Sequence, residues 1–466
     1  MDGLHQGTLV GEKKSKITND YSIIQKLGKG AYSEVYLAKQ NVSGMQRCVK
    51  VTRKKNLGIE DSEAIFEEVK ILRDIDHPHI MKVYEYYQDS SNIYIISEYL
   101  SGGELFERII ESKCFSEKIA ANYMHQILSA VAYLHAHNVI HRDLKPENIV
   151  FESKDAKSNL KIIDFGTSKK IKINERLKAK LGTAYYIAPE VLKNNYDVKC
   201  DVWSCGVILY VFLCGYPPFN AKSDDDIFKK ILHGTFSFPK EEWAGISDEA
   251  KQLISLMLTY DPVARPSAAE ILKHPWFAKA QTGSSSTDTN IAVLKNFASF
   301  YSNSKLQKAI LIYFVNFFDI KEEKSRLLQA FKDLDKDHDG QISKNELIEA
   351  YKKFSSGGLI ANDAEEILKK LDFNNTSAID FSEFLVANVN YMQSLNKQKL
   401  RQIFDLIDKD KNGFVTPQEL KEFLNLTDKA HETFVIQMIA EVDKNHDGLI
   451  SFDEFDSMMS DFSKKI

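Results

Sequence analysis

The sequence has few cysteines and no long hydrophobic run, and both absences restrict what it can be. Five Cys occur among 466 residues, an odd number without any Cys-x-x-Cys pair, which disfavours a disulfide scaffold and favours a reducing intracellular compartment. The longest apolar stretch, residues 202–216, contains Ser and Gly and is too short to span a bilayer, so we expect a buried helix there. The net charge of −5 gives no sign of polyanion binding, so no nucleic acid partner is expected.

The N-terminal residues also lack two targeting features. The first ten, MDGLHQGTLV, contain no signal-peptide hydrophobic region, and Asp2 stands where N-myristoylation requires Gly. We therefore expect a cytoplasmic protein and leave peripheral membrane association open.

Charge and residue types are distributed unevenly along the chain. All five Cys and all three Trp precede residue 277, whereas residues 326–466 hold 18 Lys and Arg against 26 Asp and Glu, a net charge of −8. This break predicts a domain boundary, and the acidic last third is suited to hold cations. Between the two parts, residues 283–290 (GSSSTDTN) have the polar composition of a linker. Apolar residues at helical spacing then predict an amphipathic helix, with Leu306, Ile310, Tyr313, Phe314 and Phe317 on one face.

A series of short motifs in the first part points to phosphoryl transfer. Gly28 and Gly30 lie in a turn between two strand-like runs, where glycine lets the backbone approach phosphates, although Ser33 stands where a third Gly is expected. Lys50 ends a further β-like run, and Glu68 follows on an expected helix. Three motifs come next, in this order: HRDLKPEN at 141–148, DFG at 164–166 and APE at 188–190. Residues 21–277 therefore resemble a eukaryotic protein kinase domain.

The resemblance implies a role for each motif. Lys50 would hold the α- and β-phosphates of ATP and be oriented by Glu68, while Asp164 and Asn148 would ligate Mg²⁺. Asp143 would accept the proton of the substrate hydroxyl, and Lys145 would contact the γ-phosphate in a pattern similar to serine/threonine kinases. Further nucleotide contacts would come from the glycine-rich turn and from the hinge between lobes: Leu27, Gly28, Lys29, Gly30, Val35, Ser97, Glu98 and Leu100.

Three positions refine this prediction. Ala179 occupies the place where related kinases carry an activating phosphate, and we hypothesise that Glu175 or a neighbour partly substitutes for that phosphate opposite Arg142. Glu104 matches the carboxylate that calmodulin-regulated kinases use to select Arg three residues before the target. The alternative is that Glu104 is simply a solvent-exposed charge. Ser97 falls at the gatekeeper position, where so small a residue predicts unusual sensitivity to inhibitors with bulky aryl groups.

The acidic last third contains four twelve-residue loops with the ligand spacing of calcium-binding EF-hands. Their ligand positions are Asp335, Asp337, Asp339, Gln341 and Glu346; Asp372, Asn374, Thr376 and Glu383; Asp408, Asp410, Asn412, Phe414 and Glu419; and Asp443, Asn445, Asp447, Leu449 and Glu454. Positions 7 (Gln341, Phe414, Leu449) would contribute backbone carbonyls. The second loop has Ser377 in place of the glycine at position 6, so calcium binding there is left open. Ile342, Ile379, Val415 and Ile450, each at loop position 8, would pair the loops.

The two motif sets in this order resemble the calcium-dependent protein kinases of plants and protists over nearly the whole chain. The resemblance implies a multidomain protein: an N-terminal extension (1–20), an α+β bilobal protein kinase domain (21–277), a linker and autoinhibitory junction (278–325) and an all-α calmodulin-like domain with four EF-hands (326–466). It implies a calcium-activated serine/threonine kinase, using ATP and Mg²⁺, whose junction blocks the kinase at rest and is captured by the Ca²⁺-loaded domain.

Several finer expectations complete the prediction. Leu294, Phe297 and Tyr301 would join residues 306–317 as apolar anchors of the captured junction, and Lys295 would meet acidic groups of the substrate cleft. Substrates are expected to be proteins with basic residues before Ser or Thr, and the enzyme to be a monomer. A catalytically inactive calcium-regulated scaffold and a small-molecule kinase remain alternatives, disfavoured by the intact catalytic motifs and by the peptide-loop signature GTAYYIAPE.

Overall fold

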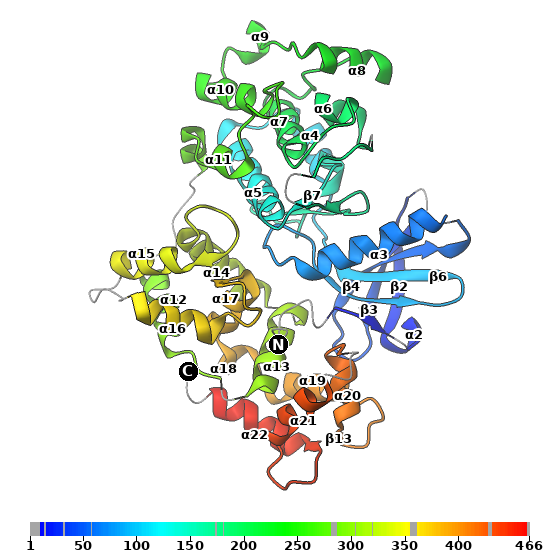
Figure 1. Cartoon of the computed structure of the whole chain (residues 1–466), viewed down its shortest axis with the longest axis vertical. Coiled ribbons are helices and arrows are strands. Elements are labelled where there is room, and N and C mark those ends of the chain that lie inside the picture. The colour runs from blue at the N-terminus through cyan, green and yellow to red at the C-terminus, as the bar shows by residue number, and fades with distance from the viewer. Residues whose placement is uncertain are drawn as a thin grey trace.

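The computed structural model describes residues 10–463 except for 14, 31–32, 57, 173–174, 180, 281–286, 303, 319, 355–360 and 427–430. Figure 1 shows three parts of the molecule: a small lobe built on a sheet, a helical large lobe and a C-terminal region. No described helix is long and apolar enough to cross a membrane.

The small lobe consists of one six-stranded sheet and one long helix. Its elements are β1 (Glu12–Lys13), α2 (Ile17–Asp20), β2 (Tyr21–Lys29), β3 (Ser33–Gln40), β4 (Gln46–Arg53), α3 (Ile59–Asp74), β5 (Val83–Gln88) and β6 (Asn92–Glu98). The strand order is β1-β5-β6-β4-β3-β2, and only β1 pairs in parallel with its neighbour. Strand alternation buries Val49 completely on one face of β4 and so leaves Lys50 on the other face.

The large lobe packs helices around α7, which is buried along its length. Its helices are α4 (Leu105–Ser112), α5 (Glu117–Ala136), α6 (Pro189–Leu192), α7 (Lys199–Cys214), α8 (Asp224–His233), α9 (Lys240–Trp243), α10 (Asp248–Met257) and α11 (Ala268–Leu272). Its short strands are β7 (Val139–Ile140), β8 (Ile149–Phe151), β9 (Leu160–Ile162) and β10 (Lys169–Lys170). The buried helix expected over residues 202–216 is confirmed by α7.

Two junction helices, α12 (Thr287–Ser299) and α13 (Lys305–Phe317), lead into the C-terminal region. The first half of that region comprises α14 (Lys321–Leu334), β11 (Ile342–Ser343), α15 (Lys344–Phe354), α16 (Ala361–Leu371), β12 (Ala378–Ile379) and α17 (Phe381–Asn388). After α18 (Tyr391–Ser394), the second half comprises α19 (Lys397–Ile407), β13 (Phe414–Val415), α20 (Pro417–Phe423), α21 (His431–Ala440), β14 (Ile450–Ser451) and α22 (Phe452–Ser463).

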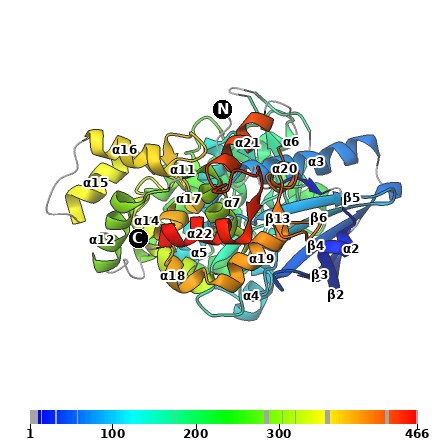
Figure 2. The same ribbon diagram turned by 90° about the horizontal axis from the view of Figure 1, so that it is seen from below.

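The junction helices belong to the core of the C-terminal region. One continuous cluster of buried side chains joins both helices to both halves of the region. Seen from below in Figure 2, α15 and α16 lie at the end far from the small-lobe sheet, whereas α19 lies beside that sheet. The junction is therefore held by the C-terminal region in this structure.

Three local expectations for the junction need correction or extension. Residues 287–290, expected in a linker, form the first turn of α12, while residues 283–286 lie outside the described part of the chain. Leu294 and Phe297 are buried as expected, but Tyr301 is 55% exposed and does not anchor the junction. The helix expected to be amphipathic, α13, is buried on nearly all sides, because the kinase lobes cover the face that the C-terminal region leaves open.

Candidate active site and calcium-binding loops

The cleft between the lobes contains a lysine held by two acids. Lys50 Nζ lies 3.0 Å from Glu68 Oε1 on α3 and 3.6 Å from Asp164 Oδ1. Burial alone would lower the pKa of Lys50, but the charges of Glu68 and Asp164 outweigh it and raise that pKa, so the ammonium is charged at neutral pH. Strand β4 and helix α3 thus bring together two residues that lie eighteen positions apart in the sequence.

A second cluster forms around Asp143 on the large-lobe side of the cleft. One carboxylate oxygen of Asp143 accepts hydrogen bonds from the backbone and hydroxyl of Thr183, at 3.1 and 3.0 Å. The other accepts from Lys145 Nζ at 2.8 Å and from Asn148 Nδ2 at 3.1 Å. The structure therefore gathers the three residues expected to be catalytic and adds Thr183 to them.

This catalytic segment is anchored by a buried aspartate. Asp201 on α7 is fully buried and accepts hydrogen bonds from the backbone amides of His141 and Arg142, both at 3.0 Å. Arg142 has a φ of 72°, a conformation that a non-glycine residue keeps only when its surroundings enforce it. Asp201 thereby fixes the turn on which Asp143 stands.

The structure does not bring Glu175 to Arg142. Arg142 donates to the backbone carbonyl of Thr167, whereas Glu175 accepts from the amide of Lys172 at 2.8 Å and lies 3.9 Å from Lys169 Nζ. Glu175 itself therefore does not pair with Arg142 in this structure, and its neighbours 173 and 174 lie outside the described residues. Carbonyl groups of the loop after the DFG motif satisfy the arginine instead.

The expected nucleotide contacts surround the same cleft. Leu27 is 41% exposed near the end of β2. The Gly30 amide donates to the Ser33 carbonyl at 2.8 Å, and this hydrogen bond joins the two sides of the glycine-rich turn. Ser97 is buried at the end of β6, directly opposite Cys48 of β4. At the hinge, the Glu98 carboxylate accepts hydrogen bonds from the amide of Lys82 and from Lys161, and the Glu98 amide donates to the Lys82 carbonyl at 3.0 Å. The remaining members of the set are placed along these elements: Gly28 and Lys29 in β2, Val35 in β3, and Leu100 just after β6.

Glu104 lies at the mouth of the cleft as an exposed N-cap of α4. Partial burial and the nearby carboxylates of Glu107 and Glu147 raise its pKa. Such a pKa shift marks a locally negative surface, because each carboxylate opposes the ionisation of the others. This surface is suited to a cationic side chain.

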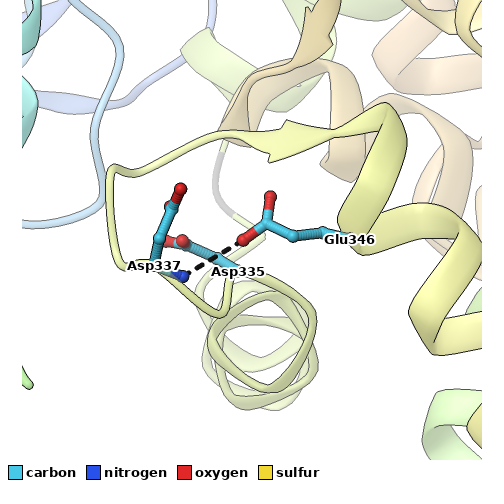
Figure 3. A group of neighbouring side chains, drawn as sticks. All are labelled: Asp335, Asp337 and Glu346. Carbon is cyan, nitrogen blue, oxygen red and sulfur yellow. Dashed lines mark hydrogen bonds between the residues drawn. The ribbon is translucent and has the colours of Figure 1, made fainter.

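In the C-terminal region, the first calcium loop brings its acids together. Figure 3 shows Asp335, Asp337 and Glu346 facing a common centre, with the Asp337 amide donating to Glu346 Oε1 at 3.2 Å. Carboxylate oxygens of all three lie within 4.8 Å of one another. Burial, with the charges of Asp339 and Glu346, raises the pKa of Asp335. A converging set of hard oxygen donors whose mutual repulsion a cation would relieve fits Ca²⁺.

The third loop repeats this arrangement with Asp408, Asp410 and Glu419. In the fourth loop, Lys444 N donates to Glu454 Oε1 at 2.9 Å and Gly448 N to Asp443 Oδ2 at 2.8 Å, which is the hydrogen-bond pattern of loops 1 and 3. The expected ligands Asn412, Phe414, Asn445, Asp447 and Leu449 lie within the same two loops, and Asp339 and Gln341 lie in the first.

The second loop keeps the backbone shape with fewer acids. Ser377 occupies the glycine position with a φ of 67°, and its amide donates to Asp372 at 2.8 Å. Asn374 donates its side-chain amide to Asp380, and the Thr376 hydroxyl donates to a backbone carbonyl. Burial raises the pKa of Glu383 to about 8. This loop is therefore preorganised by hydrogen bonds that do not require a cation.

The loops pair as the sequence predicts. Ile342 lies opposite Ile379 in the β11–β12 pair, and Val415 opposite Ile450 in the β13–β14 pair. All four side chains are buried, so each pair of loops shares a small apolar centre.

Comparison with known proteins matches both parts of the chain. A model of the protein kinase domain matches residues 21–277, and a model of the EF-hand domain pair matches residues 324–387 and 397–460. The chain is 39% identical to calcium-dependent protein kinase 4 of Plasmodium falciparum, over 98% of this chain and 89% of that protein. It is 40% identical to calcium-dependent protein kinase 3 of Plasmodium berghei, over 93% of this chain and 78% of that protein.

The chain belongs to the calcium-dependent protein kinases. It is a calcium-dependent serine/threonine protein kinase with a bilobal kinase fold followed by EF-hands, as the sequence predicts. ATP and Mg²⁺ for the kinase, and Ca²⁺ for the EF-hands, follow from this membership.

In this calcium-dependent protein kinase, sequence reasoning missed the contact between the first half of the C-terminal region and the kinase lobes. Lys82 forms a buried ion pair with Asp76 at 2.8 Å and donates to Ser382 Oγ at 3.0 Å and to Asn316 of α13. The Ser382 amide in turn donates to Asp76 at 2.7 Å. One polar network thus joins the kinase segment between α3 and β5 to α13 and α17.

Two apolar contacts flank this network. Gly340, at position 6 of the first calcium loop, packs so closely on His77 and Tyr133 that a Cβ there would lie 2.5 and 2.8 Å from their ring carbons. On the other side, the rings of Tyr84 and Phe317 lie 4.9 Å apart, and Arg47 donates to the Phe317 carbonyl at 2.5 Å. These residues carry no motif, and contacts between positions some 300 residues apart, as in the Ser382–Asp76 pair, leave no local pattern in one sequence.

Proposed function

We propose that this kinase transfers the γ-phosphate of ATP to Ser or Thr of protein substrates through Asp143, Lys145, Asn148, Lys50 and Asp164. The observation that carries the proposal is the convergence of Lys145, Asn148 and Thr183 on one carboxylate, that of Asp143. Phosphoryl transfer needs alignment and charge stabilisation more than covalent chemistry, and this cluster supplies both.

Each residue then has a distinct task. Asp143 orients the substrate hydroxyl and accepts its proton, while Lys145, 2.8 Å away, stabilises negative charge on the transferred group. Lys50, kept charged by Glu68, holds the other phosphates in line. Asp164, whose side chain is 51% exposed, and the side-chain oxygen of Asn148 are the hard ligands suited to Mg²⁺, which would neutralise phosphate charge when bound. The glycine-rich turn and the hinge backbone bind the rest of the nucleotide.

Basic residues before the target site are selected by the negative surface at the mouth of the cleft. Glu104 is exposed there, with Glu107 and Glu147 close enough to raise its pKa. A substrate guanidinium would relieve this repulsion, so an Arg three residues before the target is preferred. These contacts favour a protein substrate over a small molecule.

Calcium controls this activity through the junction. At rest, the junction blocks the kinase; with calcium loops filled, the C-terminal region holds α12 and α13 away from the cleft. Support comes from the conformation described above, in which both junction helices lie in the core of the C-terminal region while Lys50 and Glu68 are paired. Lys295, exposed on α12, is free in this state to serve as the cleft-facing residue of the resting state.

The energy of calcium binding is sufficient for such a switch. Moving an equilibrium from 1:99 to 99:1 requires about 5.5 kcal/mol of differential binding. A site that prefers the active state tenfold contributes about 1.4 kcal/mol, so four sites supply about 5.6 and three about 4.2 kcal/mol. Loops 1, 3 and 4 can therefore drive most of the transition, whether or not loop 2 binds Ca²⁺.

A phosphotransfer assay tests the proposal. The full chain and its Asp143→Asn variant are given ATP, Mg²⁺ and a Ser peptide with Arg at −3, in Ca²⁺ or in chelator. We expect transfer only by the unmodified chain in Ca²⁺, and weaker transfer when the Arg is replaced by Ala. Equal activity in chelator would overturn the switch, and activity in Asp143→Asn would overturn the catalytic assignment.

A further inference from the structure

A cavity of about 920 Å³ lies behind the hinge, at the boundary between the kinase lobes and the C-terminal region. One wall comes from the kinase lobes, with Lys82, Tyr84, Glu98 and Lys161. The opposite wall comes from the end of α13 and from α14, with Phe318, Lys324 and Leu328. Its volume is in the range of pockets that enclose a drug-sized molecule. No described residue assigned to catalysis, phosphate binding or calcium binding lines the cavity. Of the expected nucleotide contacts, only the hinge residues Glu98 and Leu100 do so.

Several charged groups of this cavity have partners. Lys82 pairs with Asp76 at 2.8 Å, and Lys161 lies 3.0 Å from Glu98 and 3.5 Å from Glu152. Arg47 donates to the Phe317 carbonyl and stacks over Tyr84. The side chain of Lys324, half-buried in the first turn of α14, has no ion pair or hydrogen bond within the described part of the chain.

The surroundings make the unpaired ammonium of Lys324 costly. Burial first, and then the positive charges of Lys82 and Lys161, lower the pKa of Lys324 to about 7, although Glu98 and Glu152 act in the opposite direction. The other charged groups that line the cavity are Lys39, Arg47, Asp155 and Glu322. Among the described lysines that line the cavity, Lys82 and Lys161 are paired and Lys39 is exposed, whereas Lys324 is half-buried and its side chain has no partner among the described residues.

The remaining lining offers an apolar surface beside this charge. Tyr84, Phe318 and Leu328 are buried or nearly so and contribute rings and aliphatic carbon to the wall. Ile24 and Phe381 add to this apolar lining. A ligand that satisfies both features needs one acidic group on an apolar body.

We propose that this cavity binds a small organic carboxylate with an aromatic or aliphatic body, whose acid group pairs with Lys324. The carboxylate supplies the missing anion, and the body fills the apolar part of the cavity. Because the walls come from two parts of the chain, the bound molecule bridges the kinase lobes and the C-terminal region. A ligand that binds only the docked arrangement must favour that arrangement in return, by linkage.

Calorimetric titration of the full chain in saturating Ca²⁺ tests the site with two matched probes, 2-naphthoate and the neutral 2-naphthamide. We expect the naphthoate to bind at least about tenfold more tightly than the amide, because the neutral amide cannot form the ion pair with Lys324 in this partly desolvated site. Lys324→Met keeps the length of the side chain and should weaken naphthoate binding by the same factor while leaving the amide unchanged. Titrations in two buffers of different ionisation enthalpy should reveal proton uptake by the unmodified chain and none by Lys324→Met.

Lys332→Met is the matched control. Lys332 lies on the same helix, and burial lowers its pKa to about 8, but it does not line the cavity. This variant should bind naphthoate as the unmodified chain does. The proposal is overturned if neither probe binds, if the amide binds as tightly as the naphthoate, or if Lys324→Met and Lys332→Met behave alike.

A titration in chelator tests this site separately from the proposed calcium switch. Only the expected calcium dependence of ligand binding rests on that switch. We expect naphthoate binding to weaken without Ca²⁺, since the cavity needs the docked C-terminal region. Lys324-dependent binding that is unaltered by the chelator would establish the site and overturn the switch.

Discussion

The two halves of the C-terminal region share a sequence pattern but have different surroundings. In the first half, the calcium loop around Gly340 packs on His77 and Tyr133, and Ser382 joins a buried network with Asp76 and Lys82. In the second half, a Cβ added at Gly413 or at Gly448 would meet nothing within 4 Å.

The difference shows that one loop design serves two purposes. Loops 3 and 4 have free space beside their position-6 glycines and, like loop 1, keep the full set of expected calcium ligands. Loops 1 and 2 both contact the kinase lobes, through Gly340 and Ser382, and loop 2 has internal hydrogen bonds at positions where loop 1 has acids. The following experiments test whether the first half contributes more to docking on the kinase lobes and the second half more to the response to Ca²⁺.

The largest difference should come from the polar network. Lys82→Met leaves the buried Asp76 carboxylate without its ion pair, a change that typically costs about 3–5 kcal/mol. In contrast, Gln402→Ala removes only an exposed 3.5 Å hydrogen bond between the second half and Val42, for about 0.5 kcal/mol or less. Thermal unfolding in Ca²⁺ measures both.

The double variant Asp76→Asn/Lys82→Met is the control for the first experiment, since it removes both charges and should recover much of the loss. If Lys82→Met lowers the unfolding temperature no more than Gln402→Ala, the docking role of the first half is wrong.

A glycine pair tests the contact of the first loop directly. Gly340 and Gly413 have φ values of 84° and 90°, so Ala at either position carries a similar backbone strain of about 1–2 kcal/mol. Only at Gly340 does the new Cβ collide with kinase residues, which should add about 1–3 kcal/mol. We expect Gly340→Ala to reduce Ca²⁺-stimulated phosphorylation far more than Gly413→Ala; similar losses would contradict direct packing of the loop on the kinase.

Substitution of the glutamate at loop position 12 tests how much each loop contributes to the calcium response. Glu419→Gln in loop 3 removes a charged ligand and should raise the Ca²⁺ concentration for half-maximal activity about tenfold, or about 1.4 kcal/mol. Glu383→Gln in loop 2 should change it less than about twofold, because burial already raises the pKa of Glu383 to about 8. A calcium titration of peptide phosphorylation gives both values, and an equal shift would assign loop 2 to sensing.

The smallest effect is expected at Ser377. A serine at φ 67° is strained, and Ser377→Gly should relieve up to about 1 kcal/mol, less the entropy that glycine adds to the unfolded chain. Thermal unfolding should show a slight gain in stability without an altered calcium requirement, since Asn374 and Thr376 still lack charge. A sharp rise in calcium affinity from this change alone would show that the backbone, not the missing acids, limits loop 2.

The parts of the structure that the sequence predicts are those specified by neighbouring residues. HRDLKPEN and the four twelve-residue loops each fix a short piece of backbone, so the cluster at Asp143 and the pairing of Ile342 with Ile379 could be expected. The roles assigned to individual site residues stay predictions until activity is measured.

The errors come from positions that depend on distant partners. Tyr301 has the spacing expected of an apolar anchor, but it lies beyond the end of α12 and is exposed. Glu175 lies near Lys169, and Arg142 donates to the backbone carbonyl of Thr167 instead of pairing with Glu175. No local sequence pattern indicates the cavity at Lys324 or the network at Lys82, because both are formed by residues of α13 and α14 with kinase residues that are distant in the sequence.

The burial of α13 on nearly all sides limits how the enzyme can change state. Its eight large apolar side chains from Leu306 to Phe317 are each at most 6% exposed, and their transfer to water would cost roughly 12–24 kcal/mol in total. A helix of this kind has no stable solvated form. Any resting state in which the C-terminal region releases α13 must therefore cover this helix with another protein surface.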